Sequence, residues 1–153
     1  MVNNNMPLGI SSAPWSGFAS VILHRESNHR YVVRYGGTVE IPGGQCKFTY
    51  YAPRPQLRMA INGDQETAII VHFFPSYLQG KEDGLLAKLE PPSVNGGAWE
   101  YQLTNRRYHP VNSWLYDTWH EERRYSVYVP KIIMGPNCPP SRLVIDISSV
   151  PPN

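Results

Sequence analysis

The chain has 153 residues and a formal net charge of +2. This length suits one domain, and so small a positive excess does not by itself predict a polyanionic partner. Only 17% of the residues are charged, below the quarter or so that is usual in soluble proteins. Proline, glycine and tyrosine take their place, which favours strands and turns over a mainly helical fold.

The predicted elements begin after an N-terminal arm over 1–16. A single domain follows over 17–150, with a short tail over 151–153. In the first third of the domain, apolar and β-branched residues predict short strands at 18–24, 29–35, 38–41 and 46–51. The polar run 25–28, the Gly36-Gly37 pair and the Pro/Gly run 42–44 separate them and predict turns.

Further along, Leu57, Met59 and Ile61 alternate with polar neighbours and predict a half-buried strand. The nearly continuous apolar run 66–74 predicts a central strand that is buried on both faces. Clean alternation predicts strands over 98–104 and 124–129 and a last one through 143–147, whereas 105–117 reads as irregular.

Together these patterns give about nine to eleven short strands, with turn signals about every 8–12 residues. One-sided alternation favours antiparallel pairing. We therefore expect an all-β fold, an antiparallel β-sandwich of jelly-roll type with Pro/Gly-rich loops. The sequence shows no internal repeat.

The start of the sequence lacks the basic and apolar regions of a signal peptide. No apolar run approaches the roughly 20 residues that cross a bilayer. Cys46 and Cys138 make no disulfide framework, and we expect both to be free thiols. These features predict a cytoplasmic or other intracellular protein, and they also fit a virion-associated one.

Motifs for catalysis and cofactors are not visible. The glycine pairs do not lie between a strand and a helix as a phosphate loop requires, and no nucleophile elbow occurs. We expect no catalytic residue, no cofactor and no enzymatic activity. His109, Asp117, His120 and Glu122 are weak metal candidates, with His120 and Glu122 expected on one face of a strand; the alternative is a solvated polar loop.

The stretch 106–125 is rich in arginine and aromatic residues, the types enriched where a surface recognises a partner. Two Arg-Arg-Tyr triplets bracket further aromatic side chains. The candidate binding residues are Arg106, Arg107, Tyr108, Trp114, Tyr116, Trp119, Arg123, Arg124 and Tyr125. The alternative interpretation is that the tryptophans fill the core and that the Glu-Glu-Arg-Arg run 121–124 is self-neutralised surface.

Three functions fit these residues. The first is a structural subunit of a shell, coat or matrix, which acts through a protein partner or self-association. The second is a β-sandwich module that binds carbohydrate or peptide. The third is a nucleic-acid-binding β-sandwich, which Glu121 and Glu122 weaken because carboxylates repel phosphates. None of the three requires a membrane span.

Overall fold

The computed structural model describes residues 19–41, 43–75, 97–104, 110–134 and 139–151. Within these ranges the chain forms eight strands and two short helices. In chain order they are β1 (Ala19–Asn28), β2 (Val32–Ile41), β3 (Gly44–Pro53), α1 (Arg54–Ile61), β4 (Ala68–Pro75), β5 (Trp99–Leu103), β6 (Ser113–His120), β7 (Arg123–Pro130), α3 (Lys131–Met134) and β8 (Arg142–Ser149). No helix in this part of the chain is long and apolar enough to cross a membrane.

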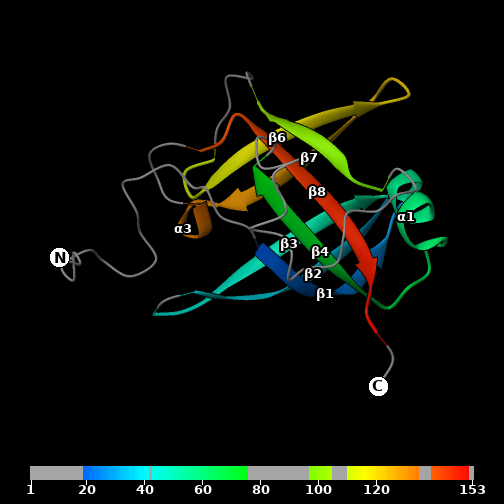
Figure 1. The fold of residues 1–153 in the computed structure, drawn as a ribbon, viewed down its shortest axis with the longest axis horizontal. Coiled ribbons are helices and arrows are strands. Elements are labelled where there is room, and N and C mark those ends of the chain that lie inside the picture. Colours follow the sequence, from blue (N-terminus) through cyan, green and yellow to red (C-terminus); the bar gives the residue numbers. More distant parts are fainter. Residues whose placement is uncertain (1–18, 42, 76–96, 105–109, 135–138, 152–153) are drawn as a thin grey trace, which may run out of the picture.

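All eight strands belong to one antiparallel sheet, in the order β3-β2-β1-β4-β8-β5-β6-β7. The edge strands β3 and β7 lie against each other without a hydrogen-bonded ladder. The sheet therefore curls into a nearly closed barrel (Figure 1). The expected all-β, antiparallel class is confirmed, but a two-sheet sandwich of jelly-roll type and the expected strand number are not.

The strand order contains the same motif twice. In each half, three consecutive strands form a meander and a fourth returns beside the first, which is a Greek key. The halves are β1 to β4 and β5 to β8, and the β4–β8 ladder joins them. A helix lies in each returning connection, with α1 and α3 at opposite ends of the barrel (Figure 1). The repeat exists in topology, although the sequence does not show it.

Tyrosines occupy much of the barrel interior. Tyr35, Tyr50, Tyr101 and Tyr116 are fully buried. Each hydroxyl has a partner: Tyr50 and Tyr101 share a hydrogen bond of 2.8 Å, Tyr35 donates to the Glu66 carbonyl and Tyr116 to the Pro140 carbonyl. Burial raises the pKa of all four phenols. Tyrosine enrichment therefore reflects, in large part, a core of paired phenols.

The two central strands are covered on both faces. Every residue from Val71 to Pro75 in β4 and from Leu143 to Ile147 in β8 is buried. This confirms a central strand buried on both faces over 71–74, whereas Glu66 and Thr67 precede β4 and are exposed. The one-sided alternation expected for the last strand is wrong, because Val144 and Asp146 are buried as well.

The predicted strand over 56–62 is wrong, because this segment is the helix α1. Prolines fit the first turn of a helix, where the missing N–H would have no partner, and Pro55 lies there. Leu57 and Ile61 are four residues apart and face the barrel with Gln56. The Gln56 amide donates to the carbonyls of Gly97 and Ile145, at 2.8 and 2.9 Å. Its oxygen accepts a hydrogen bond from the Tyr50 hydroxyl, so one side chain fastens α1 across the barrel end.

Two expected turns are also wrong. The run 25–28 continues β1, with an irregularity in the β1–β2 register between Arg25 and Ser27. Gly36 and Gly37 lie inside β2. A Cβ on Gly37 would come within 2.8 Å of the Ile22 carbonyl oxygen, so this glycine permits the close approach of two strands. Polar and glycine residues here mark a bulged, tightly packed strand pair.

Candidate functional site

The described part of the arginine- and aromatic-rich stretch does not form one surface. Arg106, Arg107, Tyr108 and His109 lie outside the described residues. The rest of the stretch forms the β6–β7 hairpin, where successive side chains point to opposite faces of the sheet. The expectation that 105–117 is irregular is wrong from Ser113 onward, where β6 begins.

Two of the candidates belong to the core. Tyr116 is fully buried, and Tyr125 packs edge-on against Trp99 with ring centroids 5.7 Å apart. Trp114 is partly buried against the same core, and the Lys131 ammonium lies 4.4 Å from its ring centroid. These three aromatic side chains pack in or against the core; for Trp114 this agrees with the alternative interpretation, which placed the tryptophans in the core.

Trp119 is different, because 65% of its surface is exposed to solvent. It lies on the outer face of β6, with the Arg124 guanidinium 5.9 Å from its ring centroid. A hollow of about 640 Å³ opens beside it on the outer face of β5, β6 and β7. The residues that line the hollow are almost all polar: Glu100, Gln102, Leu103, Thr104, Asp117, Thr118, Trp119 and Arg124. We call this region the Trp119 hollow.

Hydrogen-bonding groups of the hollow come from neighbouring strands. Gln102 of β5 stands opposite Asp117 of β6 in the ladder. The Ser126 hydroxyl of β7 donates to Asp117 Oδ1 at 2.6 Å, which fixes that carboxylate on the outer face. Carboxylates, an amide, hydroxyls and a guanidinium together supply both donors and acceptors around one exposed indole.

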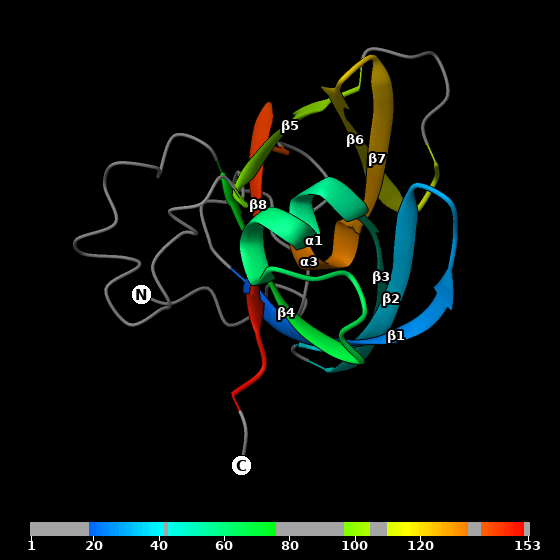
Figure 2. The same cartoon turned by 90° about the vertical axis from the view of Figure 1, so that its right-hand side faces the viewer.

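A second, smaller cavity of about 260 Å³ lies at the barrel end that α1 covers. Figure 2 views this end, with the β1–β2 turn and the β6–β7 turn beside α1. The residues that line this second cavity are Arg30, Tyr31, Arg54, Pro55, Arg58, His120, Glu121, Arg123 and Tyr125. We call it the arginine cleft. Arg123 faces this cleft whereas the next residue, Arg124, faces the Trp119 hollow.

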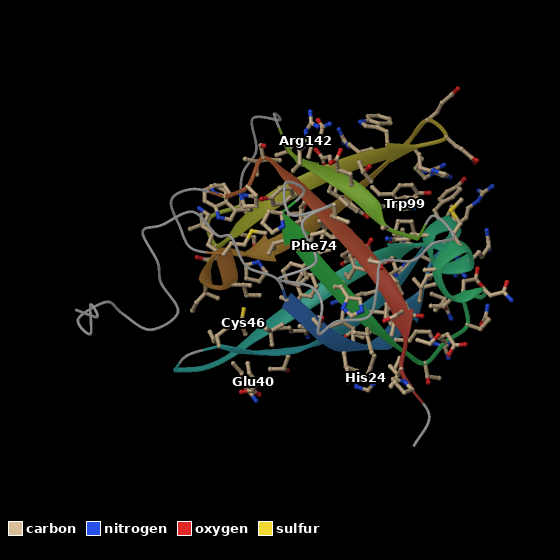
Figure 3. All side chains as sticks on the ribbon, viewed as in Figure 1. His24, Glu40, Cys46, Phe74, Trp99 and Arg142 are labelled. Atoms are coloured by element: carbon tan, nitrogen blue, oxygen red, sulfur yellow. The ribbon has the colours of Figure 1, made fainter. Side chains whose placement is uncertain are left out.

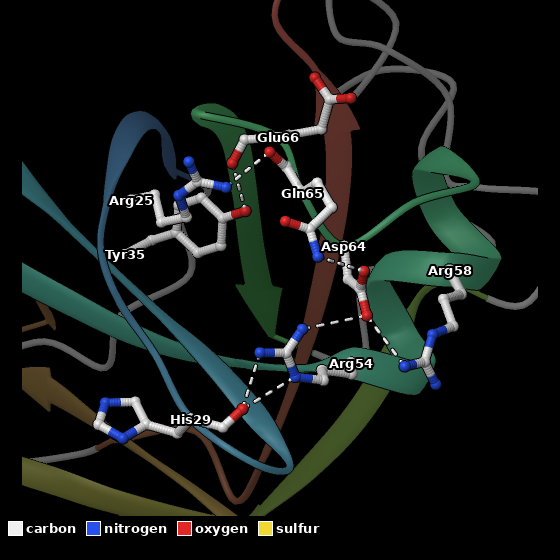
Figure 4. Close-up of polar contacts among 8 residues, drawn as sticks. All are labelled: Arg25, His29, Tyr35, Arg54, Arg58, Asp64, Gln65 and Glu66. Carbon is white, nitrogen blue, oxygen red and sulfur yellow. Dashed lines mark hydrogen bonds and ion pairs between the residues drawn. The ribbon is translucent and has the colours of Figure 1, made fainter.

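An ion-pair network supports one wall of the cleft (Figure 4). Asp64 accepts from Arg54 at 3.1 Å and from Arg58 at 2.9 Å. The Nε and Nη2 groups of Arg54 donate to the His29 carbonyl at 2.9 and 2.7 Å. Burial raises the pKa of Asp64, but the hydrogen bonds and charges of the two arginines outweigh burial and hold this pKa below its ordinary value. The network joins the β1–β2 turn to α1.

The weak metal candidates that the structure describes, Asp117, His120 and Glu122, are not brought together. His120 and Glu122 do not share a strand face, because Glu121 and Glu122 form the β6–β7 turn, with φ of 48° and 66°. His120 stacks on Trp99, with 4.7 Å between ring centroids, while Asp117 lies on the outer face. Among the described residues, no group of three or more His, Cys, Asp or Glu side chains could hold a metal ion.

A row of hydrogen-bonded polar side chains, which the sequence patterns do not predict, crosses the outer face of the sheet. The Ser20 hydroxyl lies 2.6 Å from His72 Nδ1, and His72 Nε2 lies 2.8 Å from the Ser148 hydroxyl. A serine–histidine contact is the start of a nucleophile–base pair. The three side chains link β1, β4 and β8, and neither the Trp119 hollow nor the arginine cleft includes them. Only the strand register, which puts Ser20 opposite His72, brings these residues together.

Cys46 on β3 has no disulfide partner among the described residues, and Cys138 lies outside them (Figure 3). Burial raises the pKa of the Cys46 thiol. This direction is opposite to that of an activated cysteine, whose pKa is lowered by nearby positive charge.

Comparison with known proteins finds no family model, no curated protein and no solved structure that matches this chain.

Proposed function

We propose that this protein is a non-enzymatic recognition protein that binds carbohydrate in the Trp119 hollow. The observation that carries the proposal is a largely exposed indole at the edge of a hollow with an otherwise polar lining. The face of an indole ring carries partial negative charge, and it attracts the C–H groups on the apolar face of a sugar ring. A sugar also presents hydroxyls around its rim, which both donate and accept hydrogen bonds.

The lining of the hollow meets that second requirement. Gln102 and Thr104 supply neutral donors and acceptors, and Asp117 and Glu100 supply acceptors. The volume of about 640 Å³ lies within the range of about 300–1,000 Å³ that is usual for small-ligand sites. A protein partner would favour a broader apolar centre than a single tryptophan among polar groups.

The test is a glycan-array screen, followed by calorimetry with the best sugar. Trp119→Ala should lower affinity at least about tenfold, because aromatic anchors dominate such contacts; Trp119→Phe should keep part of it. Tyr128→Ala is the matched control: this tyrosine is exposed on the same hairpin but does not line the hollow. If no glycan binds, or if Trp119→Ala binds as tightly as the parent chain, the proposal is wrong.

Self-association as a structural subunit remains a separate prediction. Light scattering on the same sample checks it: a defined oligomer in the absence of sugar would support assembly, and a monomer at high protein concentration would argue against it.

A further inference from the structure

The arginine cleft has more positive charge than its carboxylates neutralise. Arg30, Arg54, Arg58 and Arg123 line it, and Glu121 is its one acidic lining residue. Asp64 neutralises part of this charge by binding Arg54 and Arg58. With histidine neutral, four guanidinium groups against two carboxylates leave an excess of two positive charges in a small volume.

Two of the arginines have no carboxylate partner among the described residues. Arg30 and Arg123 both contact the ring of Tyr31, with their guanidinium carbons 5.1 and 3.3 Å from its centroid. The aromatic ring attracts each cation through its face, so the in-plane N–H donors of both groups can still bind an anion. Two like charges close to one ring repel each other, and an anion between them would remove that repulsion.

The cleft is also ordered before any ligand arrives. Arg54 fastens the β1–β2 turn to α1 through the His29 carbonyl and Asp64, and Arg54 N donates to the Tyr31 carbonyl at 3.0 Å. The turn that carries Arg30 and Tyr31 is therefore held in place. Preorganised donors bind an anion more tightly than flexible ones, because little side-chain freedom is lost on binding.

We propose that the arginine cleft binds a phosphoryl group. A phosphate monoester carries close to two negative charges at neutral pH, which matches the excess charge of the cleft. Its oxygens suit the forked donors of arginine. The volume of about 260 Å³ admits a phosphoryl group with a small substituent but is below the usual range for a complete drug-sized ligand. This site is separate from the Trp119 hollow and does not depend on sugar binding.

The phosphoryl group has two possible sources, a small phosphate monoester or a phosphate of single-stranded nucleic acid. Calorimetry at constant ionic strength, with chloride as the balancing anion, compares inorganic phosphate, phenyl phosphate and a short oligothymidylate. Arg123→Gln and Arg30→Gln should each weaken binding about tenfold or more, because hydrogen bonds to charged groups are the strong ones. Circular dichroism and urea unfolding establish that each variant is folded.

Arg142→Gln is the matched control, because it removes the same charge from an exposed residue of β8 that lines neither the arginine cleft nor the Trp119 hollow. Binding of the small phosphates that is lost in Arg123→Gln and kept in Arg142→Gln supports the site and identifies a small ester as the ligand. The same pattern with the oligonucleotide alone supports the site and identifies nucleic acid. No binding of any probe, or equal losses in Arg123→Gln and Arg142→Gln, would overturn the proposal.

Discussion

Replacing Gln56 by methionine tests whether one polar side chain fastens α1 to the barrel. The substitution keeps a long, unbranched side chain but removes the amide that binds the Gly97 and Ile145 carbonyls. Tyr50 keeps its hydrogen bond to Tyr101 but loses the Gln56 oxygen as the acceptor for its hydroxyl hydrogen, so this hydroxyl and two buried carbonyls each lose a partner. Each buried polar group without a partner costs about 1–3 kcal/mol. We expect Gln56→Met to lower the free energy of unfolding by about 2–4 kcal/mol and Tm by roughly 4–16 °C.

Urea unfolding followed by circular dichroism measures this loss. Met59→Gln is the matched control, because Met59 is on the exposed side of the same helix and its replacement should change stability by no more than about 0.5 kcal/mol. Gln56→Glu adds a second readout: burial raises the pKa of the new carboxyl, so the variant should lose further stability as pH rises and regain it in acid. A loss below about 0.5 kcal/mol in Gln56→Met would refute the role assigned to this side chain.

Three further changes have expected outcomes. The pKa of Asp64 is lowered in the fold, so its ionised carboxylate stabilises the folded state fully at neutral pH and less as pH falls below about 4. Asp64→Asn should therefore lower the free energy of unfolding in urea by about 1 kcal/mol at pH near 7 and by less at pH near 3. Glu121 and Glu122 both have positive φ, which asparagine and glycine adopt more easily. The double variant Glu121→Asn, Glu122→Gly should therefore have a free energy of unfolding about 1 kcal/mol higher and a higher Tm. An unchanged Tm would contradict the turn geometry. Gly37→Ala should destabilise the fold by about 1–3 kcal/mol, because the added Cβ would lie 2.8 Å from the Ile22 carbonyl oxygen. An unchanged stability would show that β1 and β2 can move apart at that point.

The sequence predicts the strand class well, because period-two alternation reports burial on one face directly. It fails where tertiary packing overrides local pattern. Leu57, Met59 and Ile61 fit a strand, yet Leu57 and Ile61 are also four residues apart, the helical spacing. The residue that decides is Pro55, whose ring suits the first turn of a helix.

The site was only partly predictable for a similar reason. Trp114 and Trp119 are five positions apart in the sequence. Because this number is odd, a strand must place them on opposite faces. Parity does not say which of the two is inside, because that depends on how β6 pairs with β5 and β7. The arginine cleft is less predictable still: Arg30, Arg58 and Arg123 come from three elements that are distant in sequence and meet only at the barrel end.

The position of β8 has a consequence for synthesis. This strand follows the other described strands in the chain, yet it lies between β4 and β5, and within the described residues its ladder with β4 is the only one between the two Greek keys. On the ribosome, β4 and β5 must therefore each present an unpaired edge until Arg142–Ser149 has left the exit tunnel. Unpaired apolar edges are sites of intermolecular pairing, so expression yield should depend on how quickly this strand follows β7 out of the tunnel.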